Sequence, residues 1–105
     1  MPVNDDVFAA LASPARREVL KLLLDGPMAV GDLAEHFAMR RPSLSEHLRV
    51  LREAGLVSER REGRHRLYSL DADPLREVSD WLTPYERFWR TKLASLRDLL
   101  DEEDL

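Results

Sequence analysis

The stretch RRPSLSEHLRVLREAGLVSERREGRHRLYSL, residues 40–70, joins the pattern of a short helix to the pattern of a β-hairpin. Leucines recur at helical spacing after Pro42, which suits a first helical turn, and a later glycine can end the helix. The residues beyond that glycine flank a polar turn with alternating and β-branched positions, as in a two-stranded hairpin. The order predicts a helix over 42–54 and a hairpin over 57–70. The leucines of the helical stripe are Leu44, Leu48 and Leu51.

Positive charge is concentrated in the same stretch. Between Arg40 and Arg66 the chain has eight arginines and four glutamates, a local balance of +4, whereas the rest of the chain carries −8. The total of −4 therefore conceals a basic segment within an acidic protein. A basic patch of this kind favours an anionic partner, and nucleic acid is the usual one.

The residues before this stretch predict three further helices. The second of these helices should begin after Ser13, a good N-cap that is followed by a proline at the first helical position, and Gly26 can end it. Apolar residues at helical spacing over 30–37 predict a third, short helix. The stripes that should face the core are Val7, Phe8 and Leu11 in the first helix and Val19, Leu20, Leu23 and Leu24 in the second.

The C-terminal segment predicts a long amphipathic helix. Apolar residues recur at intervals of three or four along residues 74–100, so they form one stripe that requires a partner. An aspartate before Pro74 provides a helix start. Pro84 cannot lie inside a helix without cost, so we expect a kink or a break there, with Thr83 capping the second part.

Length and composition bound the class of protein. A chain of 105 residues fits a single domain, 1–105, and a domain of this size buries only about two-thirds of its unfolded surface, so dimerisation would stabilise it. The absence of cysteine excludes disulfides, thiolate catalysis and zinc–thiolate sites. The N-terminal residues lack the basic segment and apolar segment of a signal peptide, and no apolar run is long enough to span a membrane. We therefore expect a cytoplasmic protein without a membrane partner.

The order of elements predicts a mainly α-helical fold with a small two-stranded β wing, a winged helix-turn-helix core over 7–70. In this fold the helix over 42–54 enters the major groove of double-stranded DNA, and the hairpin contacts the adjacent backbone. Exposed serine, arginine and glutamate can bind phosphates or base edges. The alternative is that the arginines form a charged, solvent-exposed surface that binds no partner. Our DNA-binding candidates are Arg40, Arg41, Ser43, Ser45, Glu46, Arg49, Arg61, Arg64, His65 and Arg66.

Four motifs carry a resemblance to a known family. They are ALASPARREVLKLL, VGDLAEHF, PSLSEHLRVLREAGLV and REGRHRLYSL, and with the C-terminal helix they cover nearly the whole chain. The sequence resembles the ArsR/SmtB family of bacterial winged-helix transcription repressors. The resemblance implies a homodimer that joins through its first and last helices and represses transcription at an inverted-repeat operator. The implied interface residues are Val7, Phe8, Leu11, Leu82, Tyr85, Trp89, Leu93 and Leu96.

The metal sites of that family do not carry over. Its metal sensors place cysteines near residues 29–32 of this chain, or histidine and carboxylate clusters on the last helix, and neither is present. His36, His47 and His65 lack the i, i+4 spacing of a helical metal site. We expect no metal and no cofactor, as in a non-metal-sensing subgroup. His47 is expected to pack between helices, and His65 to contact phosphate.

Several alternatives remain open at this point. The aromatic residues of the last helix could line a pocket for an unknown small-molecule effector, but we favour a role in the dimer core. The winged helix could also be a protein-interaction module without specific DNA binding. An enzyme is not expected, because no glycine-rich phosphate loop or nucleophile–base pair is present. The aromatic residues in question are Trp81, Tyr85, Phe88 and Trp89.

Overall fold

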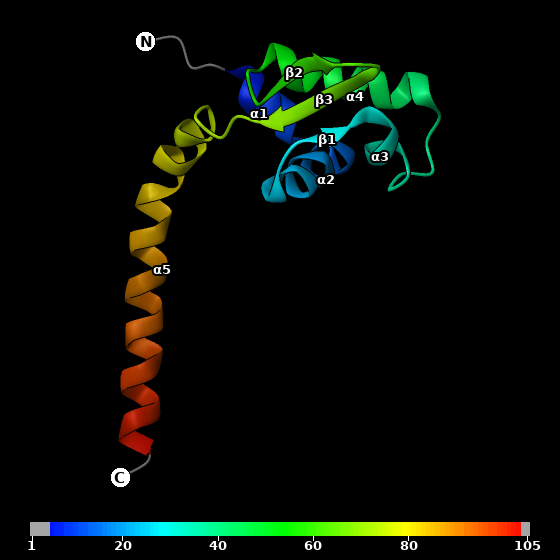
Figure 1. The fold of residues 1–105 in the computed structure, drawn as a ribbon. Coiled ribbons are helices and arrows are strands. Elements are labelled where there is room, and N and C mark those ends of the chain that lie inside the picture. Colours follow the sequence, from blue (N-terminus) through cyan, green and yellow to red (C-terminus); the bar gives the residue numbers. More distant parts are fainter. Residues whose placement is uncertain (1–4, 104–105) are drawn as a thin grey trace.

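The computed structural model describes residues 5–103 and contains five α-helices, one 3₁₀ helix and three strands in that range (Figure 1). The short elements α1 to β3 form one body, from which α5 extends. In chain order the elements are α1 (Asp5–Leu11), α2 (Pro14–Leu22), the 3₁₀ helix η1 (Leu23–Asp25), β1 (Met28–Ala29), α3 (Val30–Ala34), α4 (Arg41–Glu53), β2 (Val57–Glu62), β3 (His65–Leu70) and α5 (Leu75–Glu103). The predicted fold class, mainly helical with a small β wing, is confirmed.

One apolar core holds the body together. It is formed by residues from the first four helices, η1, the turn between α4 and β2, and the base of the hairpin, and each is almost completely inaccessible to solvent. The three leucines of the stripe in α4 are among the most deeply buried. The predicted helical face is therefore correct. The core residues are Val7, Ala10, Val19, Leu20, Leu23, Leu33, Leu44, Leu48, Leu51, Ala54, Leu56, Val57 and Tyr68.

The second helix begins as predicted but ends differently. The Ser13 hydroxyl accepts a hydrogen bond from the Arg16 backbone N–H at 3.3 Å, so Ser13 is the N-cap before the proline. The last turn tightens into η1, and Gly26 follows with a φ of 137°. Leu24, which we expected on the buried stripe, is 70% exposed. The tighter 3₁₀ winding explains this error, because it rotates Leu24 away from the core.

The helix-turn-helix is formed by α3 and α4. The third helix ends at Ala34, earlier than the predicted 30–37, and two turn-type backbone hydrogen bonds carry the chain on to Phe37. Arg40 is the N-cap of α4 and makes no side-chain capping bond there. The bounds of α4 agree with the predicted 42–54 within one residue at each end. Gly55, with a φ of 77°, ends the helix as expected.

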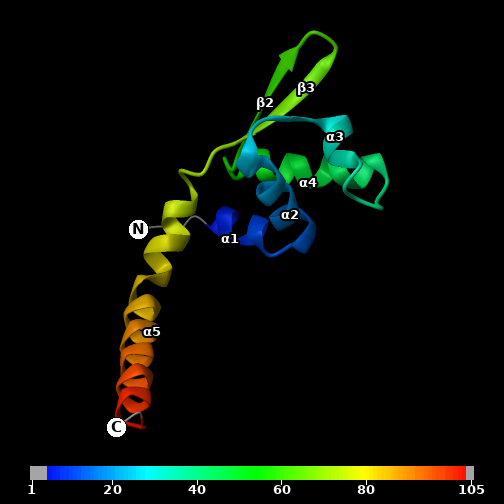
Figure 2. The ribbon, with the colours of Figure 1, turned by 60° about the horizontal axis from the view of Figure 1, so that its bottom comes forward.

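The wing belongs to a sheet of three strands in the order β1-β3-β2, with both pairings antiparallel. The hairpin of β2 and β3 agrees with the predicted range 57–70, and Gly63 begins its two-residue turn with a φ of 62°. The sequence did not reveal β1, in which Met28 pairs with Tyr68. Two residues are too few to show alternation. Figure 2 shows the hairpin projecting from the body, away from α5.

The last helix runs through Pro84 without a break. Of the expected kink or break, the break is therefore wrong, and so is the second helix start at Thr83. The Thr83 hydroxyl instead donates to the Ser79 carbonyl at 3.0 Å within the helix. Proline removes one backbone donor and leaves the carbonyl of Asp80 without its helical partner, but Asp80 is exposed, so water can hydrate that carbonyl.

Most of α5 projects beyond the body (Figure 1). A compact chain of this length would have a radius of gyration of about 13 Å. The observed value is 18.9 Å, and the principal extents are 65 × 37 × 23 Å. Only the first turns of α5 pack on the core, through Leu75 and Val78. The remainder is a helix with no other element of the described chain beside it.

Candidate nucleic-acid interface

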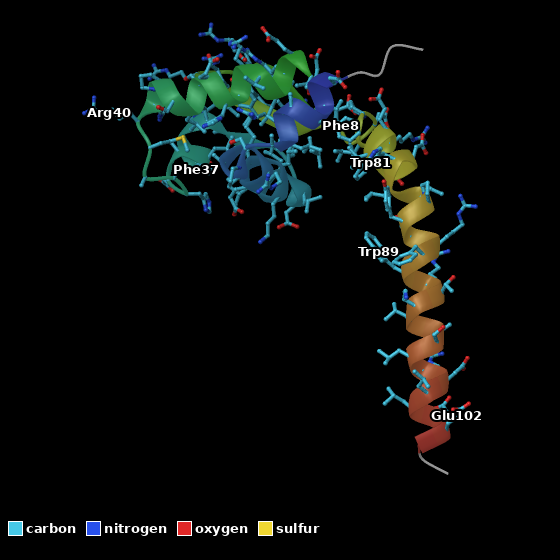
Figure 3. The ribbon with its side chains drawn as sticks, turned by 180° about the vertical axis from the view of Figure 1, so that it is seen from behind. Phe8, Phe37, Arg40, Trp81, Trp89 and Glu102 are labelled. Carbon is cyan, nitrogen blue, oxygen red and sulfur yellow. The ribbon has the colours of Figure 1, made fainter. Side chains whose placement is uncertain are left out.

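The outer face of α4 carries the side chains of this helix that the sequence analysis predicted to face DNA. Burial of the leucine stripe turns Pro42, Ser43, Ser45, Glu46 and Arg49 outward, and all five are exposed. Figure 3 shows Arg40 at the end of the body opposite α5. An exposed helix of thirteen residues with serine and arginine on one face has the form of a major-groove reader.

Arg49 is held by two carboxylates of its own helix. Its Nε and Nη2 donate to the two oxygens of Glu46 at 3.0 and 2.5 Å, and its Nη1 donates to Glu53 at 2.7 Å. The hydrogen bonds from Arg49 lower the pKa of Glu46, and those to Glu46 and Glu53 raise the pKa of Arg49. All three side chains are solvent-exposed, and ion pairs of this kind exchange readily. These three bonds use three of the five N–H groups of Arg49, so its guanidinium keeps donors for DNA.

A second charged cluster lies between the wing and the end of α4. The Glu59 carboxylate accepts hydrogen bonds from Arg66 at 2.8 and 2.9 Å, from Arg52 at 2.5 Å and from the Tyr68 hydroxyl at 3.1 Å. The bonds from Arg66, with smaller contributions from Tyr68 and Arg52, hold the pKa of Glu59 at about 2. Burial and the bond to Glu59 raise the pKa of Tyr68. This Glu59 cluster braces the wing against α4.

Sequence reasoning did not find the Glu59 cluster. It named Arg66 as a DNA-binding residue, yet in the structure Arg66 pairs with Glu59 inside the wing. The register explains the arrangement, because Glu59 lies opposite Tyr68 and Arg61 lies opposite Arg66 across the hairpin. These four side chains therefore share one face. The hairpin pattern contained this signal, but its use required the exact strand register.

The wing tip, the start of α4 and the start of α3 surround a cleft of about 320 Å³. Arg41 enters it from α4, and Arg64, His65 and Arg66 enter it from the wing. Among the described residues, Arg41 and Arg64 form no ion pair. The one carboxylate in the lining is Asp32. This basic cleft has an excess of positive charge and suits an anion such as a backbone phosphate.

Gly31, at the start of α3, lies next to the Arg41 side chain in the lining of the basic cleft. A Cβ atom at Gly31 would lie 3.7 Å from Nη2 of Arg41. The guanidinium therefore lies directly over the backbone of α3. Arg41 lines the same cleft as the wing arginines, which come from a segment more than twenty residues later in the chain.

The predicted dimer-interface residues fall into three groups. Val7 is completely buried in the core, so its assignment to an interface is wrong: α1 is amphipathic and directs Val7 inward. Phe8 packs edge-on against Trp81 with ring centroids 6.2 Å apart, and Leu11 and Leu82 are half-buried (Figure 3). The exposed group comprises Tyr85, Trp89, Leu93 and Leu96 on α5.

That exposed group belongs to a larger apolar surface on α5. Large apolar residues along the helix are each about half exposed or more, and Leu93 reaches 65%. Figure 3 shows Trp89 projecting from α5 with no other element beside it. This apolar face of α5 comprises Trp81, Tyr85, Phe88, Trp89, Leu93, Leu96, Leu99 and Leu100.

Residues 5–103 contain neither a cluster of metal-ligand side chains nor a membrane-spanning helix. Across residues 5–103, no three or more His, Asp, Glu or Cys side chains are grouped so that they could hold a metal ion. None of the helices in that range is both long enough and apolar enough to cross a membrane.

A helix-turn-helix with an exposed reader helix, followed by an arginine-bearing hairpin, defines the winged helix-turn-helix class of DNA-binding proteins. Residues 13–59 match the family model described as "Bacterial regulatory protein, arsR family". The chain belongs to this family, and it is a DNA-binding transcriptional regulator. The resemblance noted from the sequence motifs is thereby confirmed.

Individual relatives extend the match along most of the chain. The transcriptional repressor SdpR of Bacillus subtilis is 41% identical over 78 residues, which cover 74% of this chain and 87% of SdpR. The HTH-type transcriptional regulator Rv2034 of Mycobacterium tuberculosis is 39% identical over 99 residues, 94% of this chain and 90% of Rv2034. The crystal structure of the ArsR family transcriptional regulator RHA00566 superposes with a TM-score of 0.73 at 35% identity, covering 82% of this chain and 89% of that one.

Proposed function

We propose that the protein is a homodimeric repressor that binds an inverted-repeat operator. Each protomer would insert α4 into the major groove and place its wing on the neighbouring backbone. The observation that carries this proposal is the joint position of α4 and the basic cleft, which presents Arg41 and the wing arginines beside the exposed helix face. The name of the relative SdpR, a transcriptional repressor, supports repression as the outcome.

The basic cleft would hold a DNA phosphate. Arg41 and Arg64 line it without an ion-pair partner among the described residues, so binding a phosphate would not require breaking an existing pair. Base recognition would come from Ser43, Ser45 and Arg49 on α4, and Glu46 would accept from a cytosine amino group. Arg40, Arg61 and His65 would add contacts to the backbone.

The second protomer would cover the apolar face of α5. A soluble monomer rarely exposes a contiguous apolar surface of several large side chains, and beyond Trp81, which contacts Phe8, this one lies on a part of α5 that projects from the body. Helices pair along stripes repeated every three or four residues, and the stripe on α5 continues to Leu100. In this proposal the aromatic residues form the dimer core and not an effector pocket.

Footprinting tests the proposal directly. Hydroxyl-radical cleavage of the DNA upstream of the protein's own gene should reveal two protected regions about one helical turn apart on one face of the duplex. Light scattering should give two chains for each bound duplex. Uniform protection, or one chain for each duplex, would contradict the proposed dimeric operator complex.

A further inference from the structure

Arg16, on α2, connects two other helices. Its Nε donates to the Ala10 carbonyl at 2.7 Å and its Nη2 donates to the Ala9 carbonyl at 3.0 Å, both at the C-terminal end of α1. Its Nη1 lies 3.2 Å from Nδ1 of His47 on α4. One guanidinium thus links the first helix of the domain to the helix that faces DNA.

The contact defines the state of the His47 ring. A guanidinium can only donate hydrogen bonds, so Nδ1 of His47 must accept. The neutral imidazole then carries its proton on Nε2. His47 and Arg16 both line a groove of about 400 Å³ beside α4, together with Ser43 and Glu46. Both residues are partly buried there.

The linked helices continue to α5. Phe8 lies one residue before Ala9 on α1, and its ring packs edge-on against Trp81 at a centroid distance of 6.2 Å. Trp81 in turn contacts Tyr85, one of the residues of α5 that we assigned to the dimer interface. A continuous series of contacts therefore runs from α5 through α1 and Arg16 to His47.

We propose that Arg16 is a positioning residue: through His47 it fixes the placement of α4 relative to α1, and thereby relative to the helices that form the dimer. The inference rests on the proposed function, because the spacing of the two reader helices matters only for a dimer on an inverted repeat. Its mechanism is a hydrogen-bonded link and not a contact with DNA. Loss of the link would let α4 move while the core stays intact.

Arg17 provides a matched control. Its Nη1 donates to the Leu11 carbonyl at 2.7 Å, so it also binds the C-terminal end of α1. That side chain is exposed, whereas Arg16 is partly buried and reaches His47. Arg17→Met therefore removes a similar hydrogen bond without removing the link to α4.

The first test does not require DNA. In imidazole ¹⁵N spectra of the full chain, His47 should show the Nε2–H tautomer in the wild type and in Arg17→Met, and a tautomer mixture in Arg16→Met. Backbone amide shifts along α4 should change in Arg16→Met and remain close to wild type in Arg17→Met. An unchanged His47 ring and unchanged α4 amides in Arg16→Met would overturn the proposal, whether or not the protein binds an operator.

The second test measures affinity for the operator duplex. Arg16→Met and His47→Leu should each weaken binding roughly tenfold, and the double variant should bind no more weakly than either single variant, because both remove the Arg16–His47 bond. His47→Asn keeps an acceptor near the position of Nδ1 and should remain close to wild type. Additive losses, or an equal loss in Arg17→Met, would overturn the positioning role. Failure of the wild type to select any operator would instead refute the proposed function.

Discussion

Arg66 Nε lies 2.8 Å from a carboxylate oxygen of Glu59, and this pair joins the two strands of the wing on the side that faces α4. Arg52 reaches the same carboxylate from α4. The carboxylate therefore orients the hairpin and also neutralises two arginines that would otherwise repel each other. The wing is placed by charge as well as by its packed base.

Replacing Glu59 by Gln should destabilise the fold. The amide keeps the shape of the side chain but loses the charge that two arginines share, and charge-assisted hydrogen bonds of this kind contribute about 1.5–3 kcal/mol each in favourable sites. Since Glu59 remains partly accessible, we expect a loss of about 1–2 kcal/mol in the free energy of unfolding at neutral pH, measured by urea denaturation. A variant as stable as wild type would show that the cluster does not brace the wing.

The same comparison should depend on pH in one direction. Glu59 has a pKa of about 2 in the folded protein, against an ordinary value of 4.5. A lowered pKa means that the contribution to stability is present above pH 4.5 and is lost as the pH falls toward 2. The difference between wild type and Glu59→Gln should therefore shrink across that window. A difference that stays constant from pH 7 to the most acid pH at which the protein folds would contradict the assignment.

Arg49→Gln should weaken operator binding without changing thermal stability. The guanidinium forms exposed ion pairs on its own helix, which contribute little to folding, whereas a bidentate contact to guanine contributes strongly to recognition. We expect roughly a tenfold loss of affinity in a fluorescence anisotropy titration, an unchanged melting temperature and a smaller loss on non-operator DNA. Equal losses on both duplexes would indicate a phosphate contact in place of base recognition.

The basic cleft can be tested through salt dependence. Log affinity falls as log salt rises, and each phosphate contact makes this slope steeper by about 0.9. Arg41→Gln and Arg64→Gln should therefore each make the slope shallower by about that amount. Arg60→Gln is the control, because Arg60 pairs with Glu62 on the wing and does not line the cleft. A slope that responds equally to all three changes would mean that the cleft has no special role.

The apolar face of α5 predicts a dimer that one charge can disrupt. Leu93→Asp should shift the protein to monomers in light scattering and weaken operator binding, since a monomer contacts a single half-site. Leu24→Asp is the matched control, because Leu24 is 70% exposed on the body, in η1. Monomers formed equally by both variants, or by neither, would argue against dimerisation through α5.

Local patterns made much of this structure predictable. The stripe in α4, its terminal Gly55 and the turn at Gly63 each depend on residues within a few positions, so periodicity and turn chemistry sufficed. The Ser13 cap is of the same kind. These local patterns also gave the order of the elements, from which the winged helix-turn-helix was predicted.

Features that depend on distant residues were missed or misjudged. The short β1 exists only because β3 pairs with it, and the Glu59 cluster requires a known strand register. Val7 has an apolar pattern that suits either a core or an interface, and packing against other helices decides between them. The break at Pro84 was expected from the cost of proline inside a helix, whereas the exposure of this site permits the helix to continue.

The central claim is that α4 and the wing read a two-fold symmetric DNA sequence. Selection of duplexes from a random library by the purified protein, followed by sequencing, tests it most directly. The account predicts enrichment of an inverted repeat whose half-sites lie about one helical turn apart. A folded dimer that enriches no sequence would contradict the account, and the basic cleft would then require an acidic protein as its partner.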